Sequence, residues 1–550
     1  MGVVKDSALT ARTRTEALAA MATDPGLDVL VIGGGVVGAG TALDAVSRGL
    51  RTGLVEAADW AAGASSRSSG LLHGDRTALE ERAVLADRIA PHLVRPQPFL
   101  IPLRVPIVER VWGAVGVGAY DLAARVAGGR LPIQRHYDKA ATLGIFPDIR
   151  PSRLTGAIRF YDARVDGVRL VIDLVRTAVG YGALAASRAR VVGLRRNGDV
   201  VTGAVVRDEV DGQEHVIRAR QVIAATGVWS RDIEGLLGRP RRVLRPEVIR
   251  GVHVVVPRER IRGRVGLVIR TERGRLFLVP QADHWVIGAA GAPWPGGAGE
   301  VRAEVADVDE ILDRVDRVLR SRLTRADVVA VEAGLRTVAL RGDRAAGAGP
   351  VPAVLGLAPG LTVAIGDALG TYRQVAGQAV DRALGPERTR TRRSITDRIQ
   401  LVGAVGYEVA RAQADSYARR MGWTPARAEH LLGRYGAQVE QIAALVAERP
   451  DLGRPLDAAP RYLRAEVVHA VGAEGALHLD DVLSRRVPIG VEQRDGGAGV
   501  LGETVALMAG ELGWDVDRAR AEREAYVARC RAVGEAAGLV VDGPPPSGRA

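Results

Sequence analysis

The segment from residue 28 to residue 56, DVLVIGGGVVGAGTALDAVSRGLRTGLVE, restricts the fold more than any other part of the chain. It opens with an apolar run without alternation, which is typical of a strand buried on both faces of a parallel sheet. Gly33, Gly35 and Gly38 then form GxGxxG, in which glycine permits a tight turn, close approach of backbone to a diphosphate, and close packing of the next helix. We predict that this helix spans residues 36–47. A second strand ends at Glu56, whose carboxylate is placed to bind a ribose, so the unit predicts a dinucleotide site rather than a glycine-rich turn in an ordinary α/β protein.

Further motifs resemble those of the FAD-dependent glycerol-3-phosphate dehydrogenases. The polar loop AGASSRSSGLLHG at 62–74 is suited to line a flavin ring, and the similarity extends over nearly the whole chain. It is carried by APHLVRPQPFLIPL (90–103), DARVDGVRLVIDLVRTA (162–178), AATGVWSRDI (224–233), RGVHVVVPR (250–258), TYRQVAGQAVD (371–381), LLGRYG (431–436) and GALHLDDVLSRR (475–486).

The resemblance implies an α/β fold with FAD as the cofactor. The expected fold consists of an FAD-binding Rossmann-like domain of the glutathione-reductase type, a substrate domain built on an antiparallel β-sheet, and a C-terminal all-α domain. The predicted cofactor-binding residues combine the glycine motif and its acid with family positions: Gly33, Gly35, Gly38, Glu56, Ser65, Ser66, Ser69, His73, Val191, Ala225, Thr226, Gly227, Trp229, Gly366 and Asp367.

A chain of 550 residues is too long for one core, so two to four domains are expected. We predict an N-terminal tail and helix over 1–26, and an FAD-binding domain assembled from 27–97, 148–239 and 350–387. The other predicted parts are an apolar cap segment at 98–147, the substrate sheet at 240–349, a helical domain at 388–541, and a disordered tail at 542–550.

The net charge of +12 does not by itself predict a nucleic-acid partner. Only Lys5 and Lys139 among the 76 basic residues are lysines, the arginines are spread along the chain, and no nucleic-acid-reading motif accompanies them, so we predict no nucleic acid. The single cysteine, Cys530, excludes an internal disulfide and a cysteine-based metal site. We predict no bound metal.

An apolar stretch at 98–129 has two interpretations. Its charges at Arg110, Asp121 and Arg125 argue against a spanning helix, yet it is suited to an interfacial helix as well as to burial beneath the substrate domain. The family implied by the resemblance passes electrons to membrane quinone, so a quinone or another acceptor is expected. The predicted location is cytoplasmic, with peripheral contact to the inner face of the cell membrane and a homodimer left open.

The predicted catalytic residues follow from the resemblance. His253 occupies the position of the family's active-site histidine, where a neutral imidazole accepts the proton of the substrate hydroxyl. Arg336 and Arg275 match cations that face the substrate phosphate, a role that suits a fork-shaped donor. The alternatives are a histidine satisfied within its sheet and ordinary surface arginines.

The substrate side departs from the family pattern. SSKLIHGGLRYLE appears here as SSGLLHGDRTALE, so the lysine is Gly70 and the arginine and tyrosine are Thr77 and Ala78, while a second family lysine is Ala368. Three functions stay open. The first is oxidation of sn-glycerol 3-phosphate to dihydroxyacetone phosphate, and the others are oxidation of another hydroxy or amino substrate and a catalytically silent FAD-binding protein that acts through a partner. If the chain oxidises sn-glycerol 3-phosphate, arginines at other positions are expected to replace the lost cations: Arg76, Arg250 and Arg373.

Overall fold

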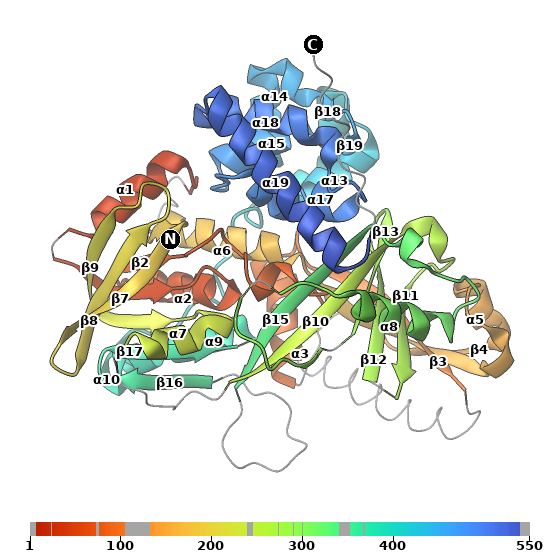
Figure 1. Cartoon of the computed structure of the whole chain (residues 1–550), viewed down its shortest axis with the longest axis horizontal. Helices are drawn as coiled ribbons and strands as arrows, with labels where there is room; N and C mark the ends of the chain where they lie inside the picture. Colours follow the sequence, from red (N-terminus) through yellow and green to blue (C-terminus); the bar gives the residue numbers. More distant parts are fainter. Residues whose placement is uncertain are drawn as a thin grey trace.

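The computed structural model describes residues 7–23, 25–72, 76–104, 132–238, 246–272, 274–289, 291–299, 301–339, 353–366 and 369–539. The predicted site residues His73 and Asp367, together with Ala368, lie outside the described residues, as does the apolar segment from residue 105 to residue 131. Figure 1 shows two sheets side by side and a helical domain, drawn in blue, above them.

The first sheet contains the predicted βαβ unit. Its order is β16 (Ala353–Ala358), β17 (Leu361–Ile365), β9 (Glu214–Ala224), β1 (Leu27–Ile32), β2 (Thr52–Val55) and β6 (Leu184–Ala186). All neighbours pair in parallel except the edge strand β16. The strands β7 (Ala189–Asn197) and β8 (Val200–Asp208) form an antiparallel hairpin that continues from β9.

Both faces of this sheet are covered, as the apolar run in β1 predicts. Val29 and Val31 pack in the core that contains α2 (Val36–Ser47), α6 (Gly167–Gly180) and α9 (Tyr372–Leu384). Leu30 and Ile32 point to the other face and pack in the core that contains α1 (Ala11–Met21). The predicted helix at 36–47 is confirmed with the same bounds.

The second sheet is mostly antiparallel and forms the right half of Figure 1. Its order is β14 (Ala292–Pro293), β10 (Pro246–Pro257), β13 (His284–Ala289), β12 (Gly274–Pro280), β11 (Gly266–Thr271), β3 (Arg95–Leu103), β5 (Gly156–Arg164) and β4 (Arg135–Asp138), and β15 (Ala330–Ala339) also pairs with β10. The helix α8 (Val305–Asp316) covers one face, where Val308 and Val315 pack against Val254 of β10.

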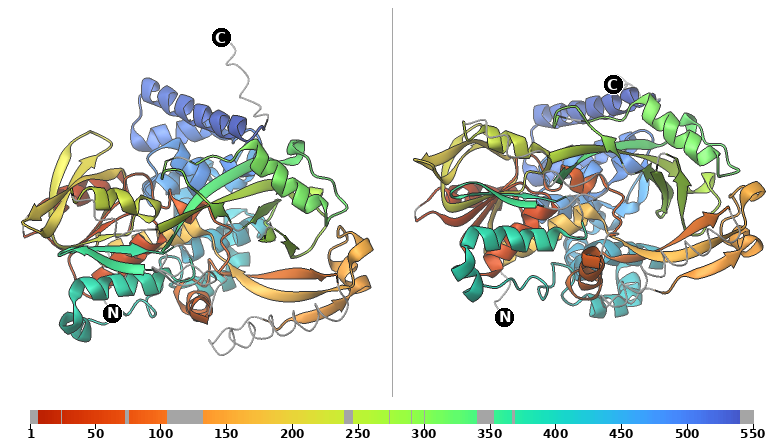
Figure 2. Two further views of the ribbon diagram at one scale, coloured as in Figure 1. Left: turned by 60° about the horizontal axis from the view of Figure 1, so that its bottom comes forward. Right: turned by 90° about the horizontal axis from the view of Figure 1, so that it is seen from below.

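Three strands of this sheet correct the predicted domain boundaries. The sequence analysis divided β3 between the first FAD-binding part, which ends at residue 97, and the cap segment, which begins at residue 98. It placed β4 in the cap segment and β5 in the second FAD-binding part, but all three strands belong to the second sheet. The reason is pairing between distant segments, because β3 pairs with β5 along its whole length and in parallel with β11. Figure 2 shows β3 and β5 as a long ribbon at the edge of the molecule.

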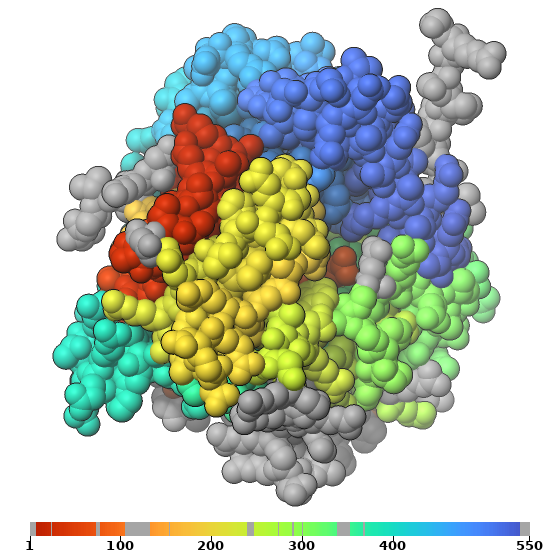
Figure 3. All heavy atoms as spheres, turned by 60° about the vertical axis from the view of Figure 1, so that its left-hand side comes forward, coloured from red at the N-terminus to blue at the C-terminus, as the bar shows by residue number. Residues whose placement is uncertain are grey.

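The C-terminal domain is helical apart from a small hairpin of β18 (Pro455–Leu456) and β19 (Ala459–Leu463). Its helices are α11 (Tyr407–Ala412), α12 (Ala414–Met421), α13 (Pro425–Tyr435), α14 (Val439–Glu448), α15 (Arg464–Gly472), α16 (Leu479–Asp481), α17 (Ile489–Glu492), α18 (Ala498–Leu512) and α19 (Val516–Ala536). The start of the chain reaches this domain, since Leu9 N donates to Ala473 O over 3.0 Å. Figure 3 shows the red N-terminal segment lying beside the yellow β7–β8 hairpin and the blue C-terminal helices.

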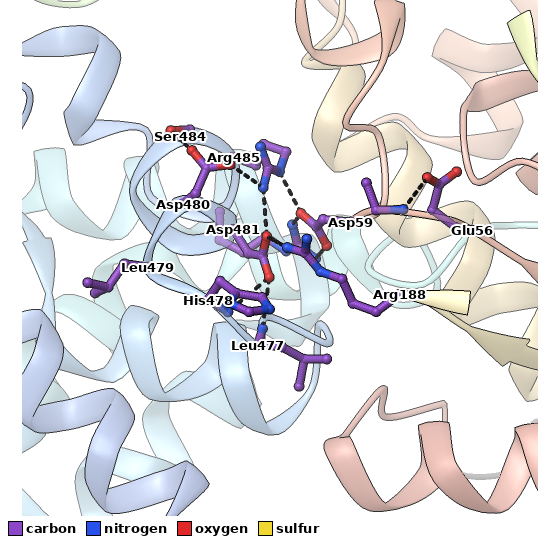
Figure 4. A network of polar contacts seen from close by, with 12 residues as sticks. Glu56, Asp59, Arg188, Leu477, His478, Leu479, Asp480, Asp481, Ser484 and Arg485 are labelled. Carbon is purple, nitrogen blue, oxygen red and sulfur yellow. Dashed lines mark hydrogen bonds and ion pairs between the residues drawn. The ribbon is translucent and has the colours of Figure 1, made fainter. Parts of the chain in front are cut away.

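Buried ion pairs join the C-terminal domain to the first sheet (Figure 4). Asp59, just beyond the end of β2, accepts from Arg485 Nε at 2.5 Å and from Arg486 Nη2 at 2.7 Å. Arg188, which follows β6, donates to Asp481 Oδ1 over 2.6 Å. Asp59 and Arg486 have side-chain exposures of 1% and 0%, so these charges lie inside the molecule.

No helix among the described residues is long and apolar enough to cross a membrane.

Candidate cofactor and substrate site

The three glycines of GxGxxG have different roles in the structure. Gly33 adopts a φ of +113°, and a Cβ atom there would lie 2.5 Å from Ala225 O. A Cβ atom on Gly38 would lie 1.8 Å from Gly33 O, so neither position accepts a side chain. At Gly35 the nearest atom to a Cβ would be Ser65 Oγ at 3.4 Å. The protein itself requires glycine at the first and third positions, whereas the second leaves open space at the start of α2.

That space is part of a cavity of about 360 Å³ at the carboxyl ends of the parallel strands. Ten predicted cofactor residues line it: Gly33, Gly35, Glu56, Ser65, Val191, Ala225, Thr226, Gly227, Trp229 and Gly366. Three do not. Gly38 is packed against Gly33, whereas Ser66 and Ser69 face a different cavity. The sequence analysis missed Leu335 and Thr337 of β15, which also line this cavity and join it to the second sheet.

The polar groups of the cavity fit a dinucleotide. Glu56 Oε2 accepts from Gly34 N at 2.6 Å and Glu56 Oε1 from Ala58 N at 2.7 Å, which holds the carboxylate at the end of β2. Burial raises the pKa of Glu56, and these two hydrogen bonds oppose that rise. Thr226 Oγ1 and Thr337 Oγ1 are buried and have no hydrogen-bond partner among the described residues. Because buried hydroxyls normally have partners, these two atoms are suited to contact a bound polar ligand.

His253 lies in the second sheet, on the face opposite α8. It pairs with Gly288 of β13 on one side and with Glu332 of β15 on the other. A Cβ atom on Gly288 would lie 2.0 Å from His253 Cδ2, so glycine there makes room for the imidazole. Arg336 lies on the same face, four residues beyond Glu332. Burial, together with the charge of Arg336, lowers the pKa of His253 to about 4, so the ring is neutral at pH 7.

Glu332 is a residue that the sequence analysis missed. It is the cross-strand neighbour of His253, and burial raises its pKa to about 6, with the charges of Arg67 and Arg529 opposing that rise. A strand period of two from Arg336 would have placed it on the same face. The structure thus brings a neutral imidazole, a carboxyl group and a guanidinium together on one face of the sheet.

Arg275 is on this face too, but farther away. It lies on β12, which is separated from β10 by β13, and its side chain is exposed. The register places Phe277 of β12 beside Gly288, and Arg275 follows the same alternation. Arg275 therefore stands at the rim of the face that His253 occupies.

Two of the arginines predicted to replace lost cations do not do so. Arg250 lies on the α8 face of β10, where its Nη2 atom is 2.6 Å from Asp307 Oδ1. Arg373 donates through Nε to Glu81 Oε2 over 2.7 Å. Each is paired with a carboxylate of a neighbouring helix, which corrects the prediction. The side chain of Arg76 lies outside the described residues.

The position of the lost family lysine is built around glycine. Gly70 has a φ of +69°, and a Cβ atom there would lie 2.3 Å from Val165 O. The backbone of Gly70 is fixed by Val165 N, which donates to Gly70 O over 2.8 Å. Ala78, at the position of the family tyrosine, is 2% exposed in α3 (Arg76–Val84). This wall of the site therefore carries no cation at position 70 and no hydroxyl at position 78.

Comparisons with known proteins agree with this geometry. A family model described as FAD dependent oxidoreductase matches residues 28–373, and one described as the C-terminal domain of alpha-glycerophosphate oxidase matches residues 394–519. The chain is 41% identical over 519 residues to a glycerol-3-phosphate dehydrogenase of Mycobacterium leprae, covering 92% of this chain and 88% of the relative. It is 31% identical over 549 residues to a mitochondrial glycerol-3-phosphate dehydrogenase of Arabidopsis thaliana, covering 92% and 86%.

A solved structure extends the likeness to three dimensions. The glycerol-3-phosphate dehydrogenase from Bacillus halodurans, complexed with FAD, superposes with a TM-score of 0.80 at 25% identity and covers 96% of this chain and 98% of its own. The comparisons confirm the predicted fold class and the predicted cofactor, FAD.

Proposed function

Because the chain belongs to the family of FAD-dependent glycerol-3-phosphate dehydrogenases, we propose that it oxidises sn-glycerol 3-phosphate to dihydroxyacetone phosphate and passes the electrons to a quinone or another acceptor. FAD, when bound, accepts the hydride that leaves the substrate carbon. The protein supplies the position of the substrate, a base for its hydroxyl proton and cations for its phosphate.

The observation that carries this proposal is the arrangement on β15. Leu335 and Thr337 line the cofactor cavity, while Arg336 between them lies on the face of the sheet that holds His253. One strand therefore contributes to the cofactor cavity and to the predicted substrate face. His253 is neutral because its pKa is about 4, so a ring nitrogen can accept the hydroxyl proton at physiological pH.

The phosphate is assigned to Arg336, with Arg275 at the rim. A guanidinium presents paired N–H donors that match phosphate oxygens. The loss of the family lysines weakens this site, because one charge-assisted hydrogen bond is worth roughly 1.5–3 kcal/mol. Phosphate binding is therefore expected to be weaker than in relatives that retain those lysines.

A second candidate function is oxidation of a less anionic hydroxy or amino substrate. The observation that favours it is the wall formed by Gly70 and Ala78, which supplies neither a cation nor a hydroxyl. Arg373 is paired with Glu81, so it is not expected to bind a substrate phosphate. Such a substrate would still use His253 as the base.

The test is anaerobic titration of the purified FAD-loaded protein, with flavin absorbance as the readout. We expect sn-glycerol 3-phosphate to bleach the flavin and His253→Asn to slow bleaching by about 10²–10⁴-fold, the usual contribution of a general base. Arg336→Gln should raise the concentration that gives half-maximal bleaching. Glycerol is the matched substrate control, since it lacks the phosphate. Flavin that stays oxidised with glycerol 3-phosphate would refute the proposal, and faster bleaching by an uncharged alcohol would favour the second candidate.

Peripheral contact with the inner face of the cell membrane is part of the same proposal. Its support is the apolar sequence from residue 98 to residue 129 and the lipid solubility of quinones. Sedimentation with anionic lipid vesicles tests it, and protein that stays in the supernatant would argue for a water-soluble acceptor.

A further inference from the structure

A second cavity, of about 750 Å³, lies where the C-terminal domain meets both sheets. Its walls come from the Ser65–Gly70 loop, the ends of β5 and β13, the helix α13 and the β19 hairpin. Figure 1 shows the blue C-terminal helices above the upper end of β13. His253, Arg336 and Arg275 do not line it. The arginines that do are Arg95, Arg164, Arg427, Arg434, Arg461 and Arg485.

Two of these arginines are direct neighbours on adjacent strands of the second sheet. Arg95 of β3 and Arg164 of β5 are directly opposite in the antiparallel register, so their side chains share one face. Like charges in this position destabilise a strand pair. Among the described residues, neither arginine has a carboxylate within ion-pair distance, and the one polar contact of the Arg95 side chain is Tyr407 Oη at 3.4 Å. Gly433 leaves room for the Arg95 guanidinium, because a Cβ atom there would lie 2.9 Å from Arg95 Nη2.

A third arginine adds to this charge. Burial lowers the pKa of Arg164, Asp166 opposes the shift, and the charges of Arg461 and Arg95 lower the pKa further. His284 lies beside Arg461 and Arg164, and its pKa falls to about 4, mainly through burial, so it adds no charge at pH 7. Three guanidinium groups therefore act on one another within the same part of the cavity.

The nearby carboxylates are already engaged. Asp166 caps α6 by accepting from Val168 N and Arg169 N, and its second oxygen lies 3.5 Å from Arg434 Nη1. Asp283 pairs with Arg461 at 3.1 Å, but its side chain is 78% exposed. Glu332, Glu429 and Glu492 also line the cavity, and Glu492 is subject to the charges of Arg461 and Arg434. None of these carboxylates forms an ion pair with Arg95 or Arg164 among the described residues, so these two charges have no directly paired negative charge.

The cavity also holds unused hydrogen-bond donors. The Nε atoms of Arg427 and Arg434 are buried and have no hydrogen-bond partner within the described part of the chain. Buried N–H groups of this kind are normally bonded to protein, water or a ligand. Arg427 is otherwise held by the carbonyl of Pro460, to which its Nη2 atom donates over 2.7 Å.

We propose that this cavity is a second anion site, which binds the phosphate group of a small molecule as a dianion between Arg95, Arg164 and Arg461. The two negative charges of a tetrahedral dianion would balance the two positive charges of Arg95 and Arg164. Its oxygens also match the forked N–H donors of guanidinium groups. The site shares Ser65 and Ser68 with the wall of the FAD cavity, so it lies beside the cofactor. Its wall includes Val255, Val286 and Glu332, which lie on the same face of the second sheet as His253. His253, Arg336 and Arg275 are not among its lining residues, and the site does not depend on turnover.

The test is thermal unfolding of the FAD-loaded protein in inorganic phosphate and in sodium chloride of equal ionic strength. We expect phosphate to raise the unfolding temperature of the wild type, and Arg164→Gln to reduce that rise to the part that phosphate bound at Arg336 contributes. In chloride, Arg164→Gln should unfold at the same or a higher temperature, because the like-charged pair is gone. Calorimetric titration should show at least a tenfold loss of phosphate affinity in Arg164→Gln and a smaller loss in Arg164→Lys, which keeps the charge but not the fork.

Two control variants separate this site from other arginines. Arg195→Gln changes an exposed arginine of β7 and should keep the full phosphate effect. Arg336→Gln removes the guanidinium assigned to the substrate phosphate and should keep the part of the rise that Arg164→Gln removes. A rise that is as large in Arg164→Gln as in the wild type, or that disappears in Arg336→Gln, would overturn the proposal. If Arg164→Gln fails to fold, Arg95→Gln tests the same pair with the same expected results.

Discussion

Replacing Asp59 by asparagine tests whether buried charges hold the C-terminal domain in place. Asp59 is the one described carboxylate that bonds Arg486, whose remaining contact is the carbonyl of Glu474 at 2.9 Å. Both charges are buried, with side-chain exposures of 1% and 0%. Removal of one partner from a buried ion pair typically costs about 3–5 kcal/mol, because the other charge stays buried without compensation. Arg485 retains Asp480 and Asp481, so we expect the lower end, about 3 kcal/mol.

The assay is urea unfolding followed by tryptophan fluorescence, with flavin absorbance recorded in parallel. We expect a lower midpoint in Asp59→Asn and weaker FAD retention, because Ala58, which precedes Asp59, donates to Glu56 in the cofactor cavity. The matched control is Asp517→Asn, which removes a surface carboxylate that is 80% exposed and pairs with Arg520. An exposed pair contributes about 0–1 kcal/mol.

A double variant shows whether the loss of stability comes from an unpaired buried charge or only from a lost contact. Asp59→Leu combined with Arg486→Met removes both charges, and buried ion pairs replaced by apolar residues are often neutral in stability. We therefore expect the double variant to recover most of the loss seen in Asp59→Leu alone. The reasoning would be refuted by an Asp59→Asn protein within about 0.5 kcal/mol of the wild type, the effect expected of an ordinary surface site.

Three further predictions follow from the two sites. Gly35→Ala should fold but lose FAD affinity, because its Cβ atom enters the cofactor cavity. Gly38→Ala should yield little folded protein, because its Cβ atom would lie 1.8 Å from Gly33 O. Flavin content tests the first expectation and expression yield the second. The pKa of His253 is about 4 in the folded protein and 6.5 for an unperturbed histidine, so the unfolded chain binds more protons between these two pH values. Stability therefore falls by about 3 kcal/mol as the pH drops through that window. His253→Asn should remove this part of the pH dependence in urea unfolding, and an unchanged profile would contradict the assigned burial. Gly288→Ala should displace the imidazole and lower the rate of flavin bleaching at unchanged FAD content, and a wild-type rate would argue against His253 as the base.

The cofactor unit was predictable because its signals are local. Strand, glycine turn, helix and terminal acid follow one another within about 30 residues, so the whole pattern is visible in one short stretch of sequence. The structure adds that Gly33 and Gly38 have no room for a side chain, whereas Gly35 borders open space in the cavity. The motif alone does not show this difference, because the space at Gly33 is limited by Ala225 O, which lies far along the chain.

The second sheet and the cations were harder to predict, because their partners come from distant segments. The strand β3 joins β5 across about 50 residues and β11 across a much larger separation, and no local pattern specifies such pairing. Arg250 and Arg373 carry the charge expected of phosphate ligands, but α8 and α3 supply carboxylates that engage them. Which partner a cation takes is decided by packing, not by residue type.

The conformation of Gly70 bears on how this protein can change. With φ at +69° and the carbonyl oxygen of Val165 2.3 Å from any added Cβ atom, a single mutation to lysine would strain the backbone and collide with Val165, the residue after β5. The backbone conformation of Gly70 and its hydrogen bond with Val165 thus oppose the replacement of this glycine by lysine. Restoring a cation at this position would therefore require a changed contact with Val165 as well as the substitution itself.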